Sequence, residues 1–343
     1  MNKTYIIAEL AWGHDGSKQQ AIDLVKAAKD SGADAVSIHI TDMPTYMVPY
    51  YGSGEGKVSK GREHLEVYKY LEEINLSCDD WLEICSHIKK LNLDLCVMAN
   101  DMNSLNFSEE FLKPEVYVIS AASFIENDFI EKVAMLKRKT LFRIGGAYLG
   151  EIEDAVNIFK NKGNNDIVLL HGFQNYPTKL EETNLSFLKS LKDIFDLDVG
   201  LADHIDGASE LAKVIPIISL AYGATCIEKH LTLDRDKKSE DFESALNPHD
   251  FKEMVNYIRS AEIAIGQSMA SDLSEATIRY RNISRKRMVA SRDIDMGEVV
   301  LKESITFMRS DTGLTPDKID SVIGRKASVK IKKYDSITLE MFS

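Results

Sequence analysis

Eight short apolar runs alternate with amphipathic helical patterns between residues 5 and 227 of this chain. Continuous apolar runs, rather than alternating ones, are typical of parallel strands that are buried on both faces. The runs occupy residues 5–10, 35–40, 93–99, 116–120, 140–144, 167–170, 198–201 and 225–227. Helical periodicity separates them at residues 19–31, 81–91, 125–136, 151–160, 185–194 and 208–219. Eight such units in about 250 residues predict an α/β fold, a (β/α)8 (TIM) barrel, over residues 1–266.

A doubly wound open sheet is the alternative reading of the same pattern. The residues after the first run, 9–16, lack the G-x-G-x-x-G spacing of a dinucleotide-binding turn, which favours the barrel. Beyond an amphipathic helix over residues 250–265, the polar segment 267–284 is expected to be a linker with one helical patch. Residues 285–343 are expected to form a small mostly-β domain with runs at 288–290, 305–308 and 327–331.

Composition limits the partners. A net charge of −12 argues against nucleic acid, so a small-molecule substrate is expected. The chain enters its first strand almost at once and has no apolar run long enough to cross a bilayer, so no membrane is expected and the cytoplasm is the expected location. The four cysteines show no C-x-x-C spacing and are expected to be reduced.

The strongest local signal is a pair of stretches, residues 200–204 and 227–231, that each lead from an apolar run into acidic and imidazole side chains. Barrel enzymes place their chemistry at the carboxyl ends of the strands. His204 and His230 therefore become candidate ligands of a divalent metal, because neutral imidazole is a common transition-metal ligand. The competing interpretation is that each histidine caps a strand and bonds backbone.

Polar residues close most of the other runs as well. Five of the eight histidines fall at or just after strand ends: His14, His39, His171, His204 and His230. His39 and His171 could equally be buried residues that backbone groups satisfy. Arg143 closes the fifth run, where its guanidinium could grip a carboxylate or phosphate or could pair with an acid such as Glu9 or Asp101.

A long irregular stretch over residues 41–75 interrupts the rhythm after the second run. It is rich in tyrosine and glycine and then carries Lys57, Lys60 and Arg62. Loops of this length are usually functional or disordered, so a substrate lid and plain surface decoration both remain open.

The chain resembles the sialic acid synthase (N-acetylneuraminate synthase) family, which includes the legionaminic, pseudaminic and spore-coat polysaccharide synthases. The resemblance covers essentially the whole chain. Its barrel motifs are residues 6–10 with His14 and Gly16, residues 169–171 with 176–178, residues 200–204, and residues 224–234 followed by Asp241 and Ser244. The tail resembles the SAF (antifreeze-like) domain at residues 289–290, 293–294, 297–298, 309, 313, 316 and 323–324.

This resemblance implies a barrel joined to a SAF domain in a domain-swapped homodimer. The implied reaction condenses phosphoenolpyruvate with a 2-acetamido-hexose to a 2-keto sugar acid, with Mn²⁺ or Mg²⁺ as the cofactor. It implies His204 and His230 as metal ligands, and we expect Glu9, Glu228 and Asp203 to be catalytic. The expected substrate-binding residues are Arg143, His39, Tyr176, Gln174, Asp241 and, from the SAF domain, Arg309.

The chain departs from the family where the donor anion would sit. Ser37 and Val118 stand in place of two family lysines, Arg143 replaces a serine, and Ala202 replaces the serine before Asp203. Either Arg143 and His39, with the lid cations, have taken over the anion, or the donor is not phosphoenolpyruvate. A metal-dependent aldolase or lyase with a non-phosphorylated donor, and an inactive sugar-binding homologue, are the alternatives.

Overall fold

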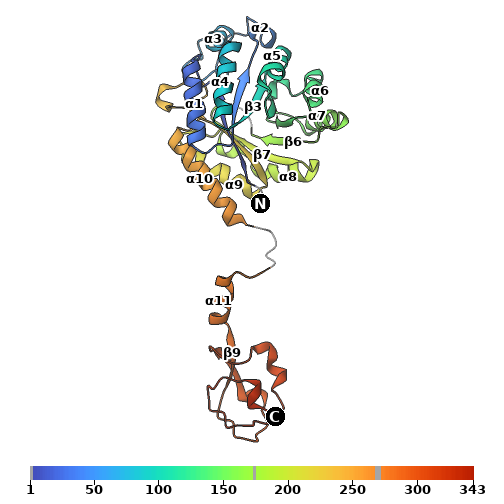
Figure 1. The fold of residues 1–343 in the computed structure, drawn as a ribbon, viewed down its shortest axis with the longest axis vertical. Coiled ribbons are helices and arrows are strands. Elements are labelled where there is room, and N and C mark those ends of the chain that lie inside the picture. The colour runs from blue at the N-terminus through green and yellow to red at the C-terminus, as the bar shows by residue number, and fades with distance from the viewer. Residues whose placement is uncertain (1–2, 173–174, 267–271) are drawn as a thin grey trace. The chain divides into compact units, whose positions relative to one another are not determined.

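A computed structural model describes residues 3–172, 175–266 and 272–343 of the 343-residue chain. The chain divides into two compact units, residues 1–266 and 267–343, which are described separately. The first unit is a closed barrel of eight parallel strands joined in sequence order, with helices around the outside (Figure 1). The barrel prediction is thereby confirmed over the open-sheet alternative.

The eight strands follow one another around the barrel, and each pairs with its sequence neighbours before β8 closes on β1. They are β1 (Tyr5–Ala11), β2 (Ala35–Ile40), β3 (Asp94–Ala99), β4 (Val116–Ile119), β5 (Lys139–Arg143), β6 (Ile167–His171), β7 (Asp198–Asp203) and β8 (Ala224–His230).

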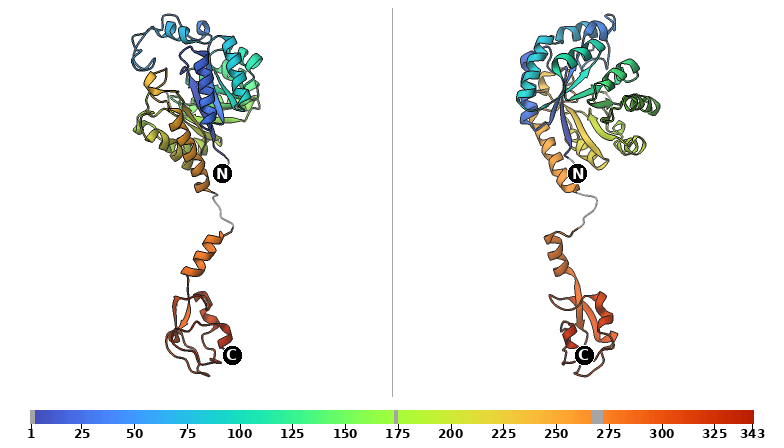
Figure 2. Two further views of the ribbon diagram at one scale, coloured as in Figure 1. Left: turned by 60° about the vertical axis from the view of Figure 1, so that its left-hand side comes forward. Right: turned by 45° about the vertical axis from the view of Figure 1, so that its right-hand side comes forward.

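The helices that cover the strands lie on the outside of the barrel in both further views (Figure 2). The main core lies between strands and helices, because the outward-facing strand residues are apolar. The helices of this unit are α1 (Lys18–Asp30), α2 (Met43–Tyr46), α3 (Val67–Ile74), α4 (Cys78–Lys90), α5 (Met102–Phe107), α6 (Asn127–Met135), α7 (Leu149–Asn161), α8 (Ser186–Phe195), α9 (Leu211–Ala221) and α10 (Pro248–Ile265).

Local sequence explains several helix starts. Ser17 accepts a hydrogen bond from the Gln20 N–H at the start of α1, and Ser77 with Asp80 forms a capping box at the start of α4. None of the helices in the described part of the chain combines the length and the apolar character that crossing a bilayer requires.

Two expectations about local structure are wrong. The stretch 41–75 is not wholly irregular, because α2 and α3 form within it and pack Met43, Val67 and Leu71 against Trp12. In the second unit, residues 327–331 form isolated bridges at Ala327 and Ile331 instead of a strand. That unit contains α11 (Glu275–Ser284) and the antiparallel pair β9 (Lys286–Ala290) and β10 (Ile305–Arg309).

Candidate active site

Side chains alternate between the lumen and the outer core over the carboxyl-terminal halves of the barrel strands, and this alternation selects the site. On β8, Cys226, Glu228 and His230 face the lumen, while Ile227 and Lys229 face outward. An apolar cluster fills the lumen, formed by Ile7, Ala35, Cys96, Met98, Val116, Val118, Leu141, Val168, Leu170, Ala202 and Cys226. Polar side chains occupy the lumen-facing positions at the carboxyl ends of the strands, as the barrel prediction requires.

Arg143 lies at the centre of these polar residues. It comes from β5, four strands from β1, and reaches across the lumen to acids on the opposite wall. Its Nη2 forms ion pairs with Glu9 and, at 2.7 Å, with the Glu228 Oε1 atom. The prediction that Arg143 pairs with a neighbouring acid is correct for Glu9, whereas Asp101 instead caps α5 by accepting from the Ser104 N–H.

Although both carboxyl groups pair with Arg143, the pKa values of Glu9 and Glu228 shift in opposite directions. Burial is the largest influence on the pKa of Glu9 and would raise it, but the Arg143 guanidinium and the other groups that face Glu9 together outweigh burial and hold that pKa below its ordinary value. Glu9 also accepts a hydrogen bond from the Ala11 N–H at 2.8 Å, across a bulge in β1. For Glu228, burial prevails and raises the pKa to about 7. One acid is therefore ionised at neutral pH, and the other lies near the middle of its titration.

His204 and His230 lie side by side at the ends of β7 and β8, with ring centroids 5.1 Å apart. The His204 Nδ1 lies 3.1 Å from the Ala202 carbonyl oxygen, while both Nε2 atoms are buried without a hydrogen-bond partner. Burial lowers the pKa of His204 to about 3 and that of His230 well below its ordinary value, so both rings are neutral at pH 7. Tyr176 packs edge-on to both rings, at 5.3 and 5.9 Å.

The two imidazoles suit a divalent metal both in their ligand type and in their neutral protonation state. Neutral rings with free Nε2 atoms are the form that binds transition metals. Within the ranges that the structure describes, no three His, Cys, Asp or Glu side chains gather as a complete ligand set.

His39 and His171 differ in their hydrogen bonding, although the sequence analysis left the same two interpretations open for both. The His171 Nε2 lies 2.9 Å from the Thr183 carbonyl oxygen, so backbone satisfies it. The His39 Nε2 is buried without a hydrogen-bond partner, 3.7 Å from the Glu9 Oε1 atom. Burial lowers the pKa of His39 to about 4. His39 belongs with the lumen-facing site residues, whereas His171 does not.

Asp203 is not brought into the lumen. It follows Ala202, which faces inward, and its own side chain lies on the outer side of β7. There the Lys229 Nζ donates to Asp203 Oδ2 at 2.7 Å and to the Ile205 carbonyl at 3.0 Å. The pair is buried on the outer face of the sheet. The catalytic role expected for Asp203 stays a prediction.

The lumen opens into two neighbouring cavities of about 290 and 340 Å³. The smaller reaches His39, Asn100 and Ser120 at the strand ends. The larger lies farther out, against Lys60, Asn175 and the loop after β8. Both cavities share Gly56, Lys57, Tyr176, Glu240 and Asp241 as lining residues.

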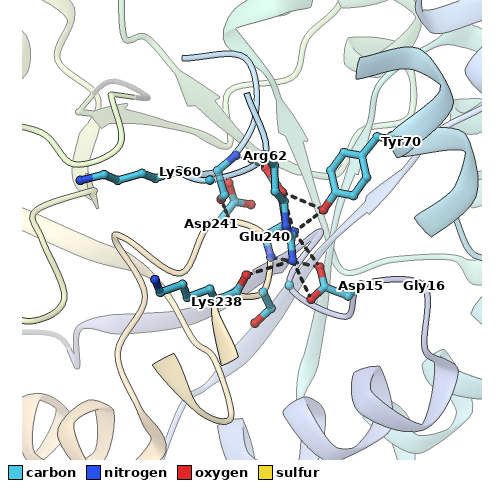
Figure 3. Close-up of polar contacts among 12 residues, drawn as sticks. Asp15, Gly16, Lys60, Arg62, Tyr70, Lys238, Glu240 and Asp241 are labelled. Carbon is cyan, nitrogen blue, oxygen red and sulfur yellow. Dashed lines mark hydrogen bonds and ion pairs between the residues drawn. The ribbon is translucent and has the colours of Figure 1, made fainter. Parts of the chain in front are cut away.

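Residues 51–66 of the long stretch form the outer wall of these cavities, and we call this segment the lid. Arg62 fastens it to the barrel, because Nη1 pairs with Asp15 at 3.1 Å and with Glu240 at 2.9 Å (Figure 3). The Tyr70 hydroxyl donates to the same Glu240 oxygen at 2.9 Å. Figure 3 also shows the Lys60 side chain pointing away from this network.

The loop after β8 supplies Glu240 and Glu243, which the sequence analysis did not select, on either side of Asp241, which it did. Ser59 of the lid donates from its backbone N–H to Glu240 at 2.7 Å and from its hydroxyl to Glu243 at 3.0 Å, and it accepts from the Asp241 N–H at 2.6 Å. Burial, reinforced by Glu240 and Glu243, raises the pKa of Asp241 well above its ordinary value. The run of acids over residues 240–243 was the sequence signal for this contact. A lid is therefore the better interpretation than surface decoration.

For two expected substrate residues, Gln174 and Arg309, the structure gives no position at this site. Gln174 falls outside the described residues. Arg309 belongs to β10 in the second unit, where its Nε and Nη2 donate to the Ile283 carbonyl at 3.2 and 3.1 Å.

Comparison with known proteins shows the family to which this chain belongs. The profile of the NeuB family matches residues 24–270, and that of the SAF domain matches residues 288–343. The chain is 34% identical to a pseudaminic acid synthase of Campylobacter jejuni, over 98% of this chain and 95% of the relative. It is 30% identical to the N,N'-diacetyllegionaminic acid synthase of the same species, over 98% of this chain and 99% of the relative.

Solved structures agree. An N-acetylneuraminic acid synthetase of Leptospira borgpetersenii superposes with a TM-score of 0.70 at 25% identity, covering 82% of this chain and 92% of the other. A spore coat polysaccharide biosynthesis protein of Bacillus subtilis superposes at 0.64 with 23% identity, over 99% and 95%, which supports the fold alone. The chain belongs to the NeuB family and carries a SAF domain at its carboxyl-terminal end.

Proposed function

We propose that this protein is a sugar-acid synthase that joins a three-carbon enol donor to the aldehyde of a sugar and so forms a 2-keto sugar acid. Phosphoenolpyruvate or a related enol is the donor, and a 2-acetamido-hexose or another sugar aldehyde is the acceptor. The names of the relatives support this proposal, since they include pseudaminic and N,N'-diacetyllegionaminic acid synthases.

The observation that carries the proposal is the convergence of unpartnered polar atoms in the lumen. Nine buried side-chain N or O atoms of the described residues have no hydrogen-bond partner, and seven of them face the site. Buried polar groups are normally paired, so such a concentration marks a place that a ligand completes. The seven are Ser37 Oγ, His39 Nε2, Arg143 Nε and Nη1, His204 Nε2, Glu228 Oε2 and His230 Nε2.

Each site residue has a proposed role that follows from its position. His204 and His230 would hold Mn²⁺ or Mg²⁺, which supplies Lewis-acid polarisation of the acceptor aldehyde when it is bound. Arg143 receives the donor carboxylate, and Glu9 and Glu228 carry or accept protons beside it. Tyr176 and Asp241 line both cavities and orient the acceptor under the lid. Arg309 would add a contact from a partner copy if the protein works as a domain-swapped dimer in the cytoplasm.

The test is product formation by the manganese-loaded protein. Supplied with phosphoenolpyruvate and a panel of 2-acetamido sugars and simple aldoses, it should release phosphate in a sugar-dependent way, with a 2-keto acid visible by mass spectrometry. His204→Ala and His230→Ala should lose both product and bound metal. His249→Ala, at an exposed histidine of α10, is the matched control and should keep both. Normal metal content in the two site variants would refute the assignment of the ligands.

A further inference from the structure

We propose that Lys229 and Asp203 are positioning residues for a divalent metal, because their ion pair on the outer face of the barrel fixes the spacing of the His204 and His230 rings on the inner face. Their role rests on the proposed function through the metal alone, and it holds whichever donor and sugar react. Groups outside the ligand shell often decide how firmly the ligands of a metal are held.

The ion pair joins the two residues that directly precede the imidazoles. At the end of β7, Asp203 precedes His204. On β8, Lys229 precedes His230, and Lys229 is the register partner of Asp203 in the parallel sheet. Lys229 Nζ donates to Asp203 Oδ2 at 2.7 Å, and neither side chain is more than 1% exposed. Since consecutive side chains point to opposite faces, each ring lies one residue beyond the ion pair on the other face. A shift of β7 against β8 at this point would therefore displace one imidazole relative to the other.

The ion pair also lies where the two strands separate. Asp203 and Lys229 are the last residues of β7 and β8 that pair with each other in the sheet. Beyond them, each chain forms its next bridge with another segment. Lys229 Nζ spans this point, because it also donates to the Ile205 carbonyl at 3.0 Å. The residues on both sides of His204 are therefore held by the residue that precedes His230.

On the inner face, an aromatic contact rather than a hydrogen bond links the two ligands within the described part of the chain. His204 Nδ1 faces the Ala202 carbonyl of its own strand, and the Nε2 atoms of both ligands have no hydrogen-bond partner. Tyr176 packs edge-on against both rings. Aromatic contacts are favourable over centroid distances of about 4.5–7 Å, whereas charge-assisted N–H···O bonds lie within about 2.7–2.9 Å. The outer pair therefore sets the distance between the imidazoles more sharply than the ring packing does.

The energetics of burial also favour a geometric role for this pair. Taking two charges out of water opposes their mutual attraction so strongly that apolar residues of similar volume often stabilise a core equally well. Two residues earlier on the same outer face, Leu201 and Ile227 are register partners of this apolar kind. Lys229 and Asp203 differ from them in imposing a direction and a distance on the two strands.

The double variant Asp203→Leu with Lys229→Met separates positioning from stability. It removes both charges and keeps the outer core filled, so it should fold and unfold in urea close to the wild type. We expect it to bind Mn²⁺ about 10- to 100-fold more weakly, as loss of outer-shell support does at metal sites. Calorimetry with Mn²⁺ measures this affinity. The visible absorption spectrum of the Co²⁺-loaded protein reports the arrangement of the ligands, and it should change in the double variant.

Lys213→Met with Glu253→Leu is the matched control. It removes a lysine–carboxylate pair of 2.7 Å that joins α9 to α10 in the helix layer, and it should leave the Mn²⁺ affinity and the Co²⁺ spectrum unchanged. If the double variant at the site does not fold, Asp203→Asn, which keeps the shape of the side chain, should weaken Mn²⁺ binding in the same direction.

The outcomes distinguish the positioning role from the proposed function. A folded variant with wild-type Mn²⁺ affinity and an unchanged Co²⁺ spectrum would overturn the positioning role and leave the synthase proposal intact. If the wild-type protein binds neither ion, or if His204→Ala and His230→Ala bind them as the wild type does, the assignment of the metal ligands fails, and the positioning role fails with it.

Discussion

Two buried ion-pair systems lie back to back on β8 and differ in what they leave unpaired. Lys229 faces outward, and its pair with Asp203 is complete, with Asp203 also accepting from the Ile205 N–H at 3.3 Å. Glu228, the preceding residue, faces the lumen and pairs with Arg143, yet Glu228 Oε2 and two Arg143 nitrogens have no partner. Adjacent residues thus differ in their pairing, because the outer pair is complete while the inner pair leaves polar atoms free, which we propose a ligand binds.

Breaking the outer pair should cause the largest loss of stability. Lys229→Met leaves the Asp203 carboxylate buried without its cation, which costs about 3–5 kcal/mol of unfolding free energy. Urea denaturation measures the loss. The double variant Asp203→Leu with Lys229→Met removes both charges and should recover much of it. A loss below about 1 kcal/mol in the single variant would mean that the outer pair is not structural.

The inner cluster should respond in the opposite way. Glu228→Gln keeps the shape of the side chain and leaves Arg143 paired with Glu9, so we expect stability to change by less than about 1.5 kcal/mol. Activity should fall about 100-fold or more, because the group to which we assign proton transfer is lost. Steady-state kinetics beside urea denaturation distinguishes the two effects. Wild-type activity with reduced stability would place Glu228 in the same structural class as Lys229.

The lid fastening should show a smaller effect, confined to substrate binding. Arg62→Ala removes the cation between Asp15 and Glu240, and the two acids then repel each other. We expect KM for the sugar to rise about 10-fold, equivalent to about 1.4 kcal/mol, with kcat changed much less. Limited proteolysis should cut faster within residues 51–66. Arg138→Ala breaks a comparable ion pair with Glu109 and is the control. An unchanged KM and an unchanged rate of proteolysis would show that residues 51–66 do not contribute to substrate binding.

The stability of the folded protein should also change gradually with pH. Burial lowers the pKa of His14 to about 3, of His39 to about 4 and of His204 to about 3, while their unfolded value is about 6.5. These imidazoles favour folding above pH 6.5, and that contribution is lost as pH falls toward 4, by up to about 1.4 kcal/mol per unit for each group.

Glu228 has the opposite effect on the pH dependence of stability. Its raised pKa, about 7, means that its contribution is present below its unfolded value and is lost as pH rises through 7. Because the histidines outnumber it, metal-free protein should lose stability between pH 6.5 and 5 in urea titrations. A flat or rising profile in that interval would mean that the imidazoles are not held neutral.

Much of the fold was readable from the sequence because the strands are buried on both faces. Their apolar runs stand out against amphipathic helices, and all eight predicted strands form. The short helices α2 and α3 were missed because tyrosine and glycine dominate their surroundings, while their stability comes from packing against Trp12, which is distant in sequence. Residues 327–331 have strand-like composition, but bridges with Ile294 and Phe342 leave them without continuous pairing.

The sequence predicted that the site residues lie at the ends of the strands, but it was not used to predict whether each side chain faces the lumen or the outside of the barrel. Asp203 and His204 are neighbours at the end of β7, so the period of two places their side chains on opposite faces, and only His204 can enter the lumen. The same rule separates Lys229 from Glu228. The reach of Arg143 across the lumen to Glu9 and Glu228 could not be predicted, because it depends on barrel closure and side-chain length rather than on local pattern.

The most direct test of the account is mass spectrometry of the product formed by metal-loaded wild-type protein and by Glu228→Gln, with pyruvate or phosphoenolpyruvate and a panel of sugar aldehydes. We predict that the wild-type protein forms a 2-keto acid whose mass equals the sugar plus the three-carbon unit, and that Glu228→Gln, although folded, forms about 100-fold less. Equal yields from both proteins would contradict the account, as would the absence of any such product from the wild-type protein across the whole panel.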